Sequence, residues 1–418
     1  MTKQFRKFTY TDNGTFITIT GYPKDEIGAV EIPATIDGKP VTTIGETAFF
    51  GCTGLTNIVI PNSVTSIGTQ AFDECSSLRQ ILIPNSVTTI GRAAFAKCSK
   101  LTSVTIPNSV TFIGDAAFVK CTSLTSITLP DSVTSIGGAA FSDCTSLTNI
   151  IIPNSVTTIG QAAFLGCTAL TNVTIPNGVT HIESHAFAFC SSLTNVIIPN
   201  RVTSIEDRTF VGCTNLTSVT IPNGVTTIGK AACAGCTSLK KLSLPNRITT
   251  IGEFAFQKCT SLTNVTIPNS STAIGQFAFQ GCTNLSNVTI PNGTTFPYGA
   301  FWECPKLQIT ESTPHYQTSA LASILLETQN RPQQIPQQNH TSGILPDPKF
   351  SGLALGSLIF GFLGLMVPLL WIPAIICGHI SLDHIEKSPK HMLGAGTAKF
   401  GLLFGYIKAV KVIWHFFS

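Results

Sequence analysis

The sequence predicts a solenoid of about twelve stacked 23-residue repeats, followed by a helical segment that inserts into a membrane. The first observation is a cysteine that recurs every 23 residues from Cys52 to Cys282, with Cys304 following after 22. The second is that phenylalanine and leucine keep the same period, three residues before and three residues after these cysteines. The third is an uncharged run of thirty residues, 352–381, which exceeds the roughly 20 residues that span a bilayer. A constant period of this size is the signature of a repeat architecture.

The composition excludes several classes of protein. Of the 418 residues, 43% are hydrophobic and 11% are charged, and the formal net charge is +4. This charge density is less than half that of an ordinary soluble domain, and it excludes a disordered or strongly acidic chain. The net charge is also too small for an electrostatic grip on nucleic acid, so we expect no nucleic-acid partner.

Each repeat contains the same local signals, and residues 101–123 (LTSVTIPNSVTFIGDAAFVKCTS) illustrate them. The β-branched residues of 101–106 favour a short strand, which Pro107 ends because it lacks an N–H donor. Residues 110–113 favour a second extended piece. The spacing of apolar residues in 117–121 favours a helical turn with one inward side. One repeat cannot bury its own apolar face, so the repeats must stack on one another.

At these columns the chain resembles the BspA-like leucine-rich repeat family over about residues 16–307. The family signature L-x-x-I-x-I-P-x-x-V-x-x-I-G-x-x-A-F-x-x-C is found from Leu55 onward. The resemblance implies a leucine-rich repeat solenoid over residues 46–310, with a parallel β-sheet on one face, and an N-terminal capping repeat over residues 1–45. Members of the family are mostly surface or host-interaction proteins. The repeat has no catalytic residues, so we expect no enzyme activity and no cofactor.

The pattern changes after the repeats. Residues 311–349 lose the period and gather glutamine and proline, which indicates a semi-extended linker. Residues 350–418 form the predicted membrane domain, with transmembrane helices at about 352–380 and 393–417. Three lysines interrupt the second segment, so an amphipathic helix that lies on the membrane stays open as its alternative.

This tail resembles a small bacterial membrane domain of unknown function. The matching residues are 351–364, 374–382 and a second glycine-rich helix at 394–406. No apolar run of 7–15 residues follows the basic start of the chain, so no secretory signal is predicted. We therefore expect a multi-pass protein of the cell membrane with its repeats in the cytoplasm. Lysines on both sides of the predicted helices leave the orientation open.

Two clusters could carry chemistry. Cys233 and Cys236 form a C-x-x-C motif, which can bind a metal or undergo redox chemistry, although both residues also occupy apolar columns of the repeat. His181, Glu183 and His185 replace the usual residues of one repeat and offer the donor atoms of a zinc site. We interpret the first pair as structural and the second cluster as a solvated polar patch.

The exposed strand positions favour a binding face. Two ladders of outward-pointing residues follow the period, and they carry mainly hydroxyl and amide groups without any aromatic residue. This composition predicts weak or multivalent contact. The candidate binding residues are Asn149, Asn172, Thr174, Asn195 and Thr220.

Together with the predicted membrane domain, these features predict a non-enzymatic, membrane-anchored leucine-rich repeat protein. It contacts the lipid bilayer through its C-terminal helices and a protein partner through the solenoid, as a binding or adhesion-type scaffold. The alternatives are a metal- or thiol-dependent site at one of the two clusters, or a purely structural spacer.

Overall fold

The computed structural model describes residues 2–271, 273–291, 296–297 and 299–311. The chain divides into two units, residues 1–333 and 334–418, and all described residues belong to the first. Apart from Glu311, the predicted linker 311–349 and the predicted membrane helices 352–380 and 393–417 lie outside the described residues.

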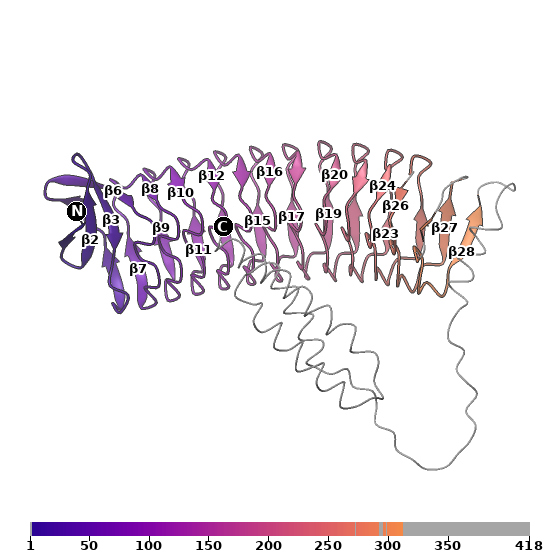
Figure 1. The fold of residues 1–418 in the computed structure, drawn as a ribbon, viewed down its shortest axis with the longest axis horizontal. Helices are drawn as coiled ribbons and strands as arrows, with labels where there is room; N and C mark the ends of the chain where they lie inside the picture. The colour runs from indigo at the N-terminus through magenta and orange to yellow at the C-terminus, as the bar shows by residue number, and fades with distance from the viewer. Residues whose placement is uncertain (1, 272, 292–295, 298, 312–418) are drawn as a thin grey trace, which may run out of the picture. The chain divides into compact units, whose positions relative to one another are not determined.

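The described residues form a β-solenoid, and they confirm the predicted stack of about twelve turns with parallel sheets (Figure 1). One face is a 13-stranded sheet in which every neighbouring pair is parallel, because successive repeats contribute equivalent strands. Its strands are β4 (Gly28–Glu31), β7 (Leu55–Val59), β9 (Gln80–Leu82), β11 (Ser103–Thr105), β13 (Ser126–Thr128), β15 (Asn149–Ile151), β17 (Asn172–Thr174), β19 (Asn195–Ile197), β21 (Ser218–Thr220), β23 (Lys241–Leu242), β25 (Asn264–Thr266), β27 (Asn287–Ile290) and β28 (Gln308–Glu311).

A second series of two-residue strands follows the proline turn of each repeat. Ten of these strands are β8 (Ser66–Ile67), β10 (Thr89–Ile90), β12 (Phe112–Ile113), β14 (Ser135–Ile136), β16 (Thr158–Ile159), β18 (His181–Ile182), β20 (Ser204–Ile205), β22 (Thr227–Ile228), β24 (Thr250–Ile251) and β26 (Ala273–Ile274). They do not form one continuous sheet. The ladder is interrupted between β10 and β12 and again between β18 and β20.

The N-terminal end has its own strand arrangement. The strands β1 (Thr2–Phe5), β2 (Phe8–Asp12) and β3 (Ile17–Gly21) pair antiparallel, and β3 then pairs parallel with β6 (Lys39–Ile44). The short strand β5 (Thr35–Ile36) pairs with β6. Phe8 is buried, and its ring meets that of Phe49 edge-on at 6.4 Å between centroids, so these strands cover the first regular repeat.

The helical turn expected after Gly114 is instead a series of tight turns. Ala116 and Lys120 have left-handed φ angles of 55° and 59°. Between Ala116 and Lys120, alternate N–H groups donate to the next repeat, and the N–H groups between them close turns within their own repeat. Phe118, for example, donates its N–H to the carbonyl of Ala140 in the next repeat at 2.8 Å. Bonds between repeats thus replace the i→i−4 bonds of a helix.

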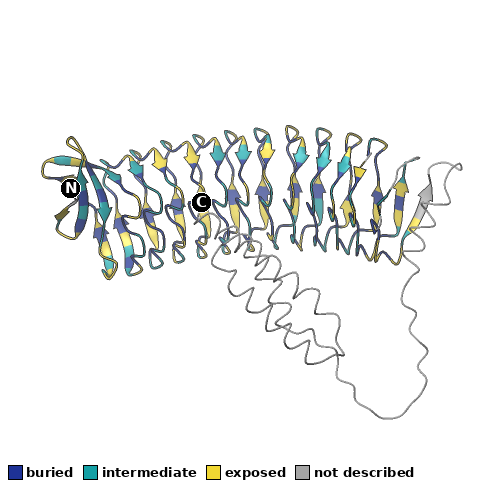
Figure 2. Ribbon diagram, in the orientation of Figure 1, coloured by how far each residue is buried: buried dark blue, intermediate teal, exposed yellow. Residues whose placement is uncertain are grey.

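Phenylalanine rings form a stack through the interior. From Phe49 to Phe210, successive rings lie 5.0–5.8 Å apart between centroids and are nearly parallel. The stack resumes at Phe256 and continues to Phe301. These rings are fully buried, and Figure 2 shows buried residues in strands along the whole described stack. The stack of rings therefore runs through the described repeats and is interrupted once, at Cys233.

The cysteine column links the repeats. Each thiol from Cys75 to Cys304 donates to the carbonyl of the residue in the phenylalanine column of the preceding repeat, at sulfur–oxygen distances of 3.1–3.3 Å. The described cysteines are all free and buried. The same side chain therefore fills apolar space and satisfies a carbonyl of the neighbouring repeat.

Candidate binding face

The 13-stranded sheet presents two ladders of side chains to solvent. In its three-residue strands the middle side chain is buried, and the first and third side chains point outward, as the period of two in a strand requires. The five predicted binding residues (Asn149, Asn172, Thr174, Asn195 and Thr220) are all exposed on this face.

Strand register brings these residues together. Asn149 pairs with Asn172, and Asn172 pairs with Asn195 on the next strand. The amide of Asn195 is held in place, because its Oδ1 accepts hydrogen bonds from Ser218 Oγ at 2.7 Å and from Thr217 Oγ1 at 3.1 Å. The amide ladder is therefore an ordered row of polar groups.

Sequence reasoning underestimated the apolar part of this face. Four large aliphatic side chains stand in the third-position ladder, with exposed fractions of 76% for Leu82, 74% for Ile151, 69% for Ile197 and 49% for Val59. Large apolar side chains at outward strand positions are the signal that could have revealed them.

The four aliphatic residues form two groups. Val59 and Leu82 are register partners on adjacent strands, and they line a shallow hollow of about 400 Å³ together with Asn57, Gln80 and other residues of β7–β11. Ile151 and Ile197 lie two strands apart and are separated by Thr174, which pairs with Ile151. The predicted binding residues therefore surround the second group.

The histidine cluster is only partly brought together. His181 and Glu183 line a hollow of about 300 Å³ with Ser204 and Glu206, whereas His185 does not line it. Thr180 Oγ1 lies 2.9 Å from His181 Nδ1, and Glu183 Oε2 accepts the backbone N–H of Gln161 at 2.8 Å. No group of three or more potential metal ligands was found within the described ranges.

His185 lies on the turn side of its repeat. It has a left-handed φ of 63°, and its N–H donates to the carbonyl of Asp207 at 3.0 Å. Burial lowers the pKa of its imidazole, and the neighbouring Arg208 lowers that pKa further, against the opposing effect of Asp207. The imidazole is therefore neutral over a wider pH range than usual.

Glutamates in a glycine column explain the hollow beside His181. Gly160 belongs to this column, and a Cβ there would come within 2.8 Å of the backbone of the preceding repeat. Glu183 and Glu206 occupy the equivalent positions in the next two repeats, and the ladder is interrupted between β18 and β20 at this point. Glu183 and Glu206 both line the hollow, but the ladder is also interrupted between β10 and β12, where this column keeps glycine.

The C-x-x-C pair lies in the core. Cys233 takes the place of a stacked ring and is 1% exposed, and Cys236 donates its thiol to the carbonyl of Phe210 at 3.2 Å. A hydrogen bond with Cys233 and burial raise the pKa of the Cys236 thiol well above its usual value. Because the thiolate is the reactive form, this environment favours an inert thiol.

A family model for the BspA-type leucine-rich repeat region matches residues 24–147, 111–231 and 203–322. The chain belongs to the BspA-type leucine-rich repeat family. Among solved structures, it is similar to a leucine-rich cell surface protein from Faecalibacterium prausnitzii, with 32% identity over 78% of this chain and 97% of that one and a TM-score of 0.52.

Two further solved structures are similar to this chain. A leucine-rich repeat protein from Bacteroides ovatus is 28% identical over 74% of this chain and 99% of that one, with a TM-score of 0.48. The pneumococcal vaccine antigen PcpA is 20% identical over 75% and 88%, with a TM-score of 0.52, and shows the shared fold alone. No curated protein is detectably similar.

Proposed function

We propose that this leucine-rich repeat protein is a non-enzymatic scaffold that binds a protein partner through the exposed face of its 13-stranded sheet. The observation that carries the proposal is the group formed by Ile151 and Ile197, surrounded by ordered amide and hydroxyl side chains. An apolar centre with a polar rim is the usual anatomy of a protein interface.

The binding free energy expected from this contact is moderate. Full burial of an aliphatic side chain contributes about 1.5–3 kcal/mol, and part of that gain offsets the loss of translational and rotational freedom. Binding hot spots are enriched in tryptophan, tyrosine and arginine, which are absent from the Ile151–Ile197 group. The cell-surface relative at 32% identity supports a role in contact with other molecules.

Site-specific photo-crosslinking in cells tests this proposal. A photoreactive residue at Asn172, on the strand between those of the two isoleucines, is expected to form an adduct with a discrete partner. The same residue at Lys120, on the turn side, serves as the control. The Ile151→Asp, Ile197→Asp double substitution should abolish the Asn172 adduct, because it places two charges in the apolar centre. Equal adducts from both positions, or none from Asn172, would favour a structural spacer.

We also propose that residues 350–418 anchor the protein in the cell membrane as a multi-pass segment. The thirty-residue uncharged run supports this. Among the residues that the structure describes, there is no helix with the length and apolar character needed to cross a bilayer. Deletion of 350–418 should move the protein from the membrane fraction to the soluble fraction, and retention of the deleted form through carbonate extraction would refute the anchor.

The side of the membrane on which the repeats lie is a separate proposal. The free, buried cysteines of the described repeats support the reducing cytoplasm, whereas the cell-surface relative supports the outside. We propose the cytoplasmic side. Protease added to intact cells should then leave the repeats uncut, and cleavage of the repeats without lysis would place them outside.

A further inference from the structure

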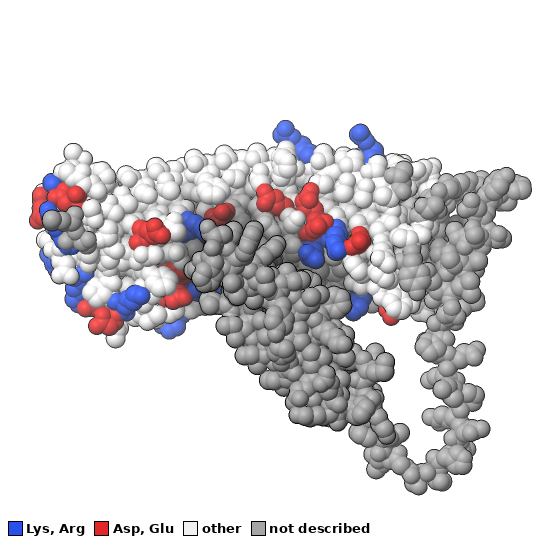
Figure 3. All heavy atoms as spheres, viewed as in Figure 1, with Lys and Arg blue, Asp and Glu red and all other residues white. Residues whose placement is uncertain are grey.

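Two adjacent lysines lie on the sheet face at β23. Lys241 stands in the first-position ladder, where the neighbouring strands carry Ser218 and Asn264, and Lys240 directly precedes it. Figure 3 shows how sparsely charged side chains are distributed over the visible surface. Two adjacent lysines on an otherwise uncharged stretch of sheet therefore stand out.

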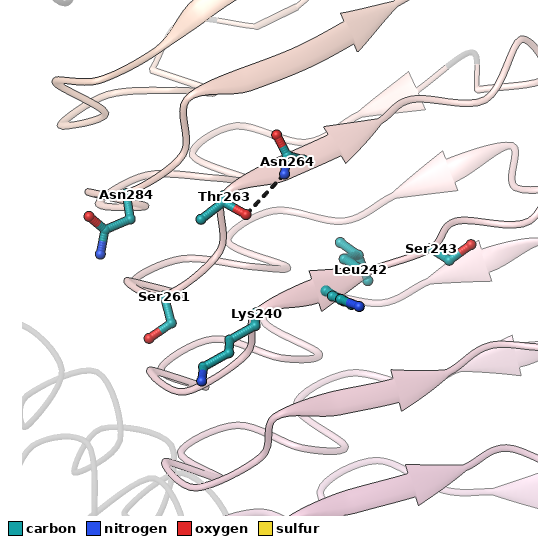
Figure 4. A pocket seen from close by; sticks show the side chains of 8 residues that line it. Lys240, Leu242, Ser243, Ser261, Thr263, Asn264 and Asn284 are labelled. Carbon is teal, nitrogen blue, oxygen red and sulfur yellow. Dashed lines mark hydrogen bonds between the residues drawn. The ribbon is translucent and has the colours of Figure 1, made fainter.

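These lysines line a hollow of about 510 Å³ on the sheet face. Figure 4 shows Lys240, Ser261 and Asn284 on the segments before the strands, and Asn264 and Ser243 further along the sheet. The complete lining is Lys240, Lys241, Leu242, Ser243, Ser261, Thr263, Asn264 and Asn284. No carboxylate is among these residues, so the hollow has a positive charge.

Both ammonium groups are free to bind a ligand. Other lysines of the solenoid form ion pairs, for example Lys97 with Glu74 at 2.7 Å and Lys230 with Glu253 at 2.6 Å. Within the described part of the chain, neither Lys240 nor Lys241 has an ion-pair partner. Lys306 adds a third cation near the hollow, because its Nζ donates to Asn284 Oδ1 at 2.7 Å.

Hydroxyl and amide side chains of the hollow can also donate hydrogen bonds. Two repeats earlier, the hydroxyl of Thr217 shares its proton between the carbonyl of Thr194 at 3.0 Å and Asn195 Oδ1 at 3.1 Å. Thr263 occupies the same column, but its Oγ1 accepts a bond from Asn264 Nδ2 at 3.0 Å, and its own proton has no acceptor in the described residues. The Oδ1 of Asn264 is already occupied by Asn287 Nδ2 at 2.8 Å. The hollow can therefore donate several hydrogen bonds to an oxyanion.

The surroundings of the hollow are polar. The third-position residues from β21 to β27 are Thr220, Ser243, Thr266 and Thr289, and the aliphatic side chains that stand on this face lie on other strands. A peptide partner would find no exposed large apolar side chain on these strands, since Leu242 is buried. Hydroxyl and amide side chains match the hydroxyl groups of a sugar. A sugar that carries a negative charge would use both features of the surface.

From this arrangement we infer that the lysine hollow and the polar strands β21–β27 bind an acidic polysaccharide, whose carboxylate or sulfate group lies between Lys240 and Lys241. The site is separate from the aliphatic group proposed for protein contact, and it does not depend on that proposal.

Binding of defined polysaccharides to the full-length protein tests the inference. The probes are dextran sulfate and polygalacturonate, which distinguish sulfate from carboxylate, uncharged dextran, and polyglutamate. At least one acidic polysaccharide should bind, and its affinity should fall as salt increases. Uncharged dextran and polyglutamate should bind at least about tenfold more weakly, because each lacks one of the two features that the surface matches.

Matched charge variants locate the site. The double substitution Lys240→Gln, Lys241→Gln should weaken the acidic polysaccharide about tenfold or more, since hydrogen bonds to charged groups are the stronger ones. Lys100→Gln, Lys120→Gln removes the same charge from exposed positions outside the sheet and should leave the affinity unchanged. Three results would overturn the inference. They are an equal loss of affinity in both variants, tight binding of polyglutamate, and failure of both acidic polysaccharides to bind. A Tm equal to that of the wild type shows that each variant is folded.

Discussion

The gap in the phenylalanine stack predicts that Cys233→Phe stabilises the protein. Rings elsewhere in the column lie 5.0–5.8 Å from both neighbours, and Cys233 interrupts this sequence between Phe210 and Phe256. The cysteine fills less volume than a ring, although its backbone continues the stacking bonds: its N–H donates to the carbonyl of Ala255 at 2.8 Å.

The magnitude follows from two contributions. A ring at this position would restore two stacked pairs, each contributing about 0.5–1.5 kcal/mol. Filling an under-packed site gains a further amount on the order of 1–3 kcal/mol, reduced by any local overpacking. Together these contributions amount to about 2–6 kcal/mol. Overpacking costs about 1–3 kcal/mol, so we expect Cys233→Phe to raise the free energy of unfolding by about 1–3 kcal/mol. Phe164→Cys, in a regular repeat, should lower it by a comparable amount.

Thermal melting and zinc analysis decide between packing and chemistry. For large domains a change of 1 kcal/mol corresponds to a shift of roughly 2–4 °C in Tm, so both variants are measurable. The packing argument predicts a higher Tm for Cys233→Phe and no bound zinc in either protein. A lower Tm together with loss of zinc that is present in the wild type would refute the reasoning and assign a metal site to Cys233 and Cys236.

Two further predictions concern the backbone and the thiols. Gly160→Ala should cost about 1–3 kcal/mol, because its Cβ would lie 2.8 Å from the preceding repeat. Gly235→Ala isolates the effect of a φ of 74°, with the nearest atoms 3.7 Å away, and should cost about 1 kcal/mol; equal costs in urea unfolding would contradict the crowding argument. Burial raises the pKa of the Cys52 thiol to about 11 and that of Cys144 to about 12. Their contribution to stability is therefore complete below the unfolded value of about 8.5 and should fall by about 1.4 kcal/mol per pH unit for each thiol as pH rises from there toward 11–12. Tm measured from pH 7 to 10.5 checks this, and a flat profile would show that the thiols are solvated.

The periodic columns were predictable because each records the same packing requirement many times. Leu101, Phe118 and Cys121 are fully buried as their spacing indicates, and the proline after each strand marks the turn correctly. The turn geometry was harder to predict, since Ala116 and Lys120 have no intrinsic preference for a left-handed φ. Tertiary bonds from neighbouring repeats impose that conformation, and a single repeat read alone does not contain them.

The binding face illustrates a different limit. The ladders were identified from their period, but Ile151 and Ile197 were grouped with the threonines of the same ladder because their columns are mainly polar. Their outward positions follow from the strand alternation, but the average composition of the ladder does not reveal individual exposed aliphatic side chains. The lysine hollow was likewise hidden, because it depends on the hydrogen bonds that occupy Asn264 and leave Thr263 free to donate.

The thiol bonds between repeats have an evolutionary consequence. Each repeat offers its successor the same carbonyl that its own cysteine uses in its predecessor, so every junction is interchangeable with the next. Loss of one whole unit between the two regions, such as residues 200–222, would join two compatible surfaces and shorten the sheet by one strand spacing of about 4.8 Å. Unequal recombination within the gene could therefore change the distance between the aliphatic group and the lysine hollow in fixed steps. The number of repeats would then set the spacing between the two regions, and so determine which partners can bind both at once.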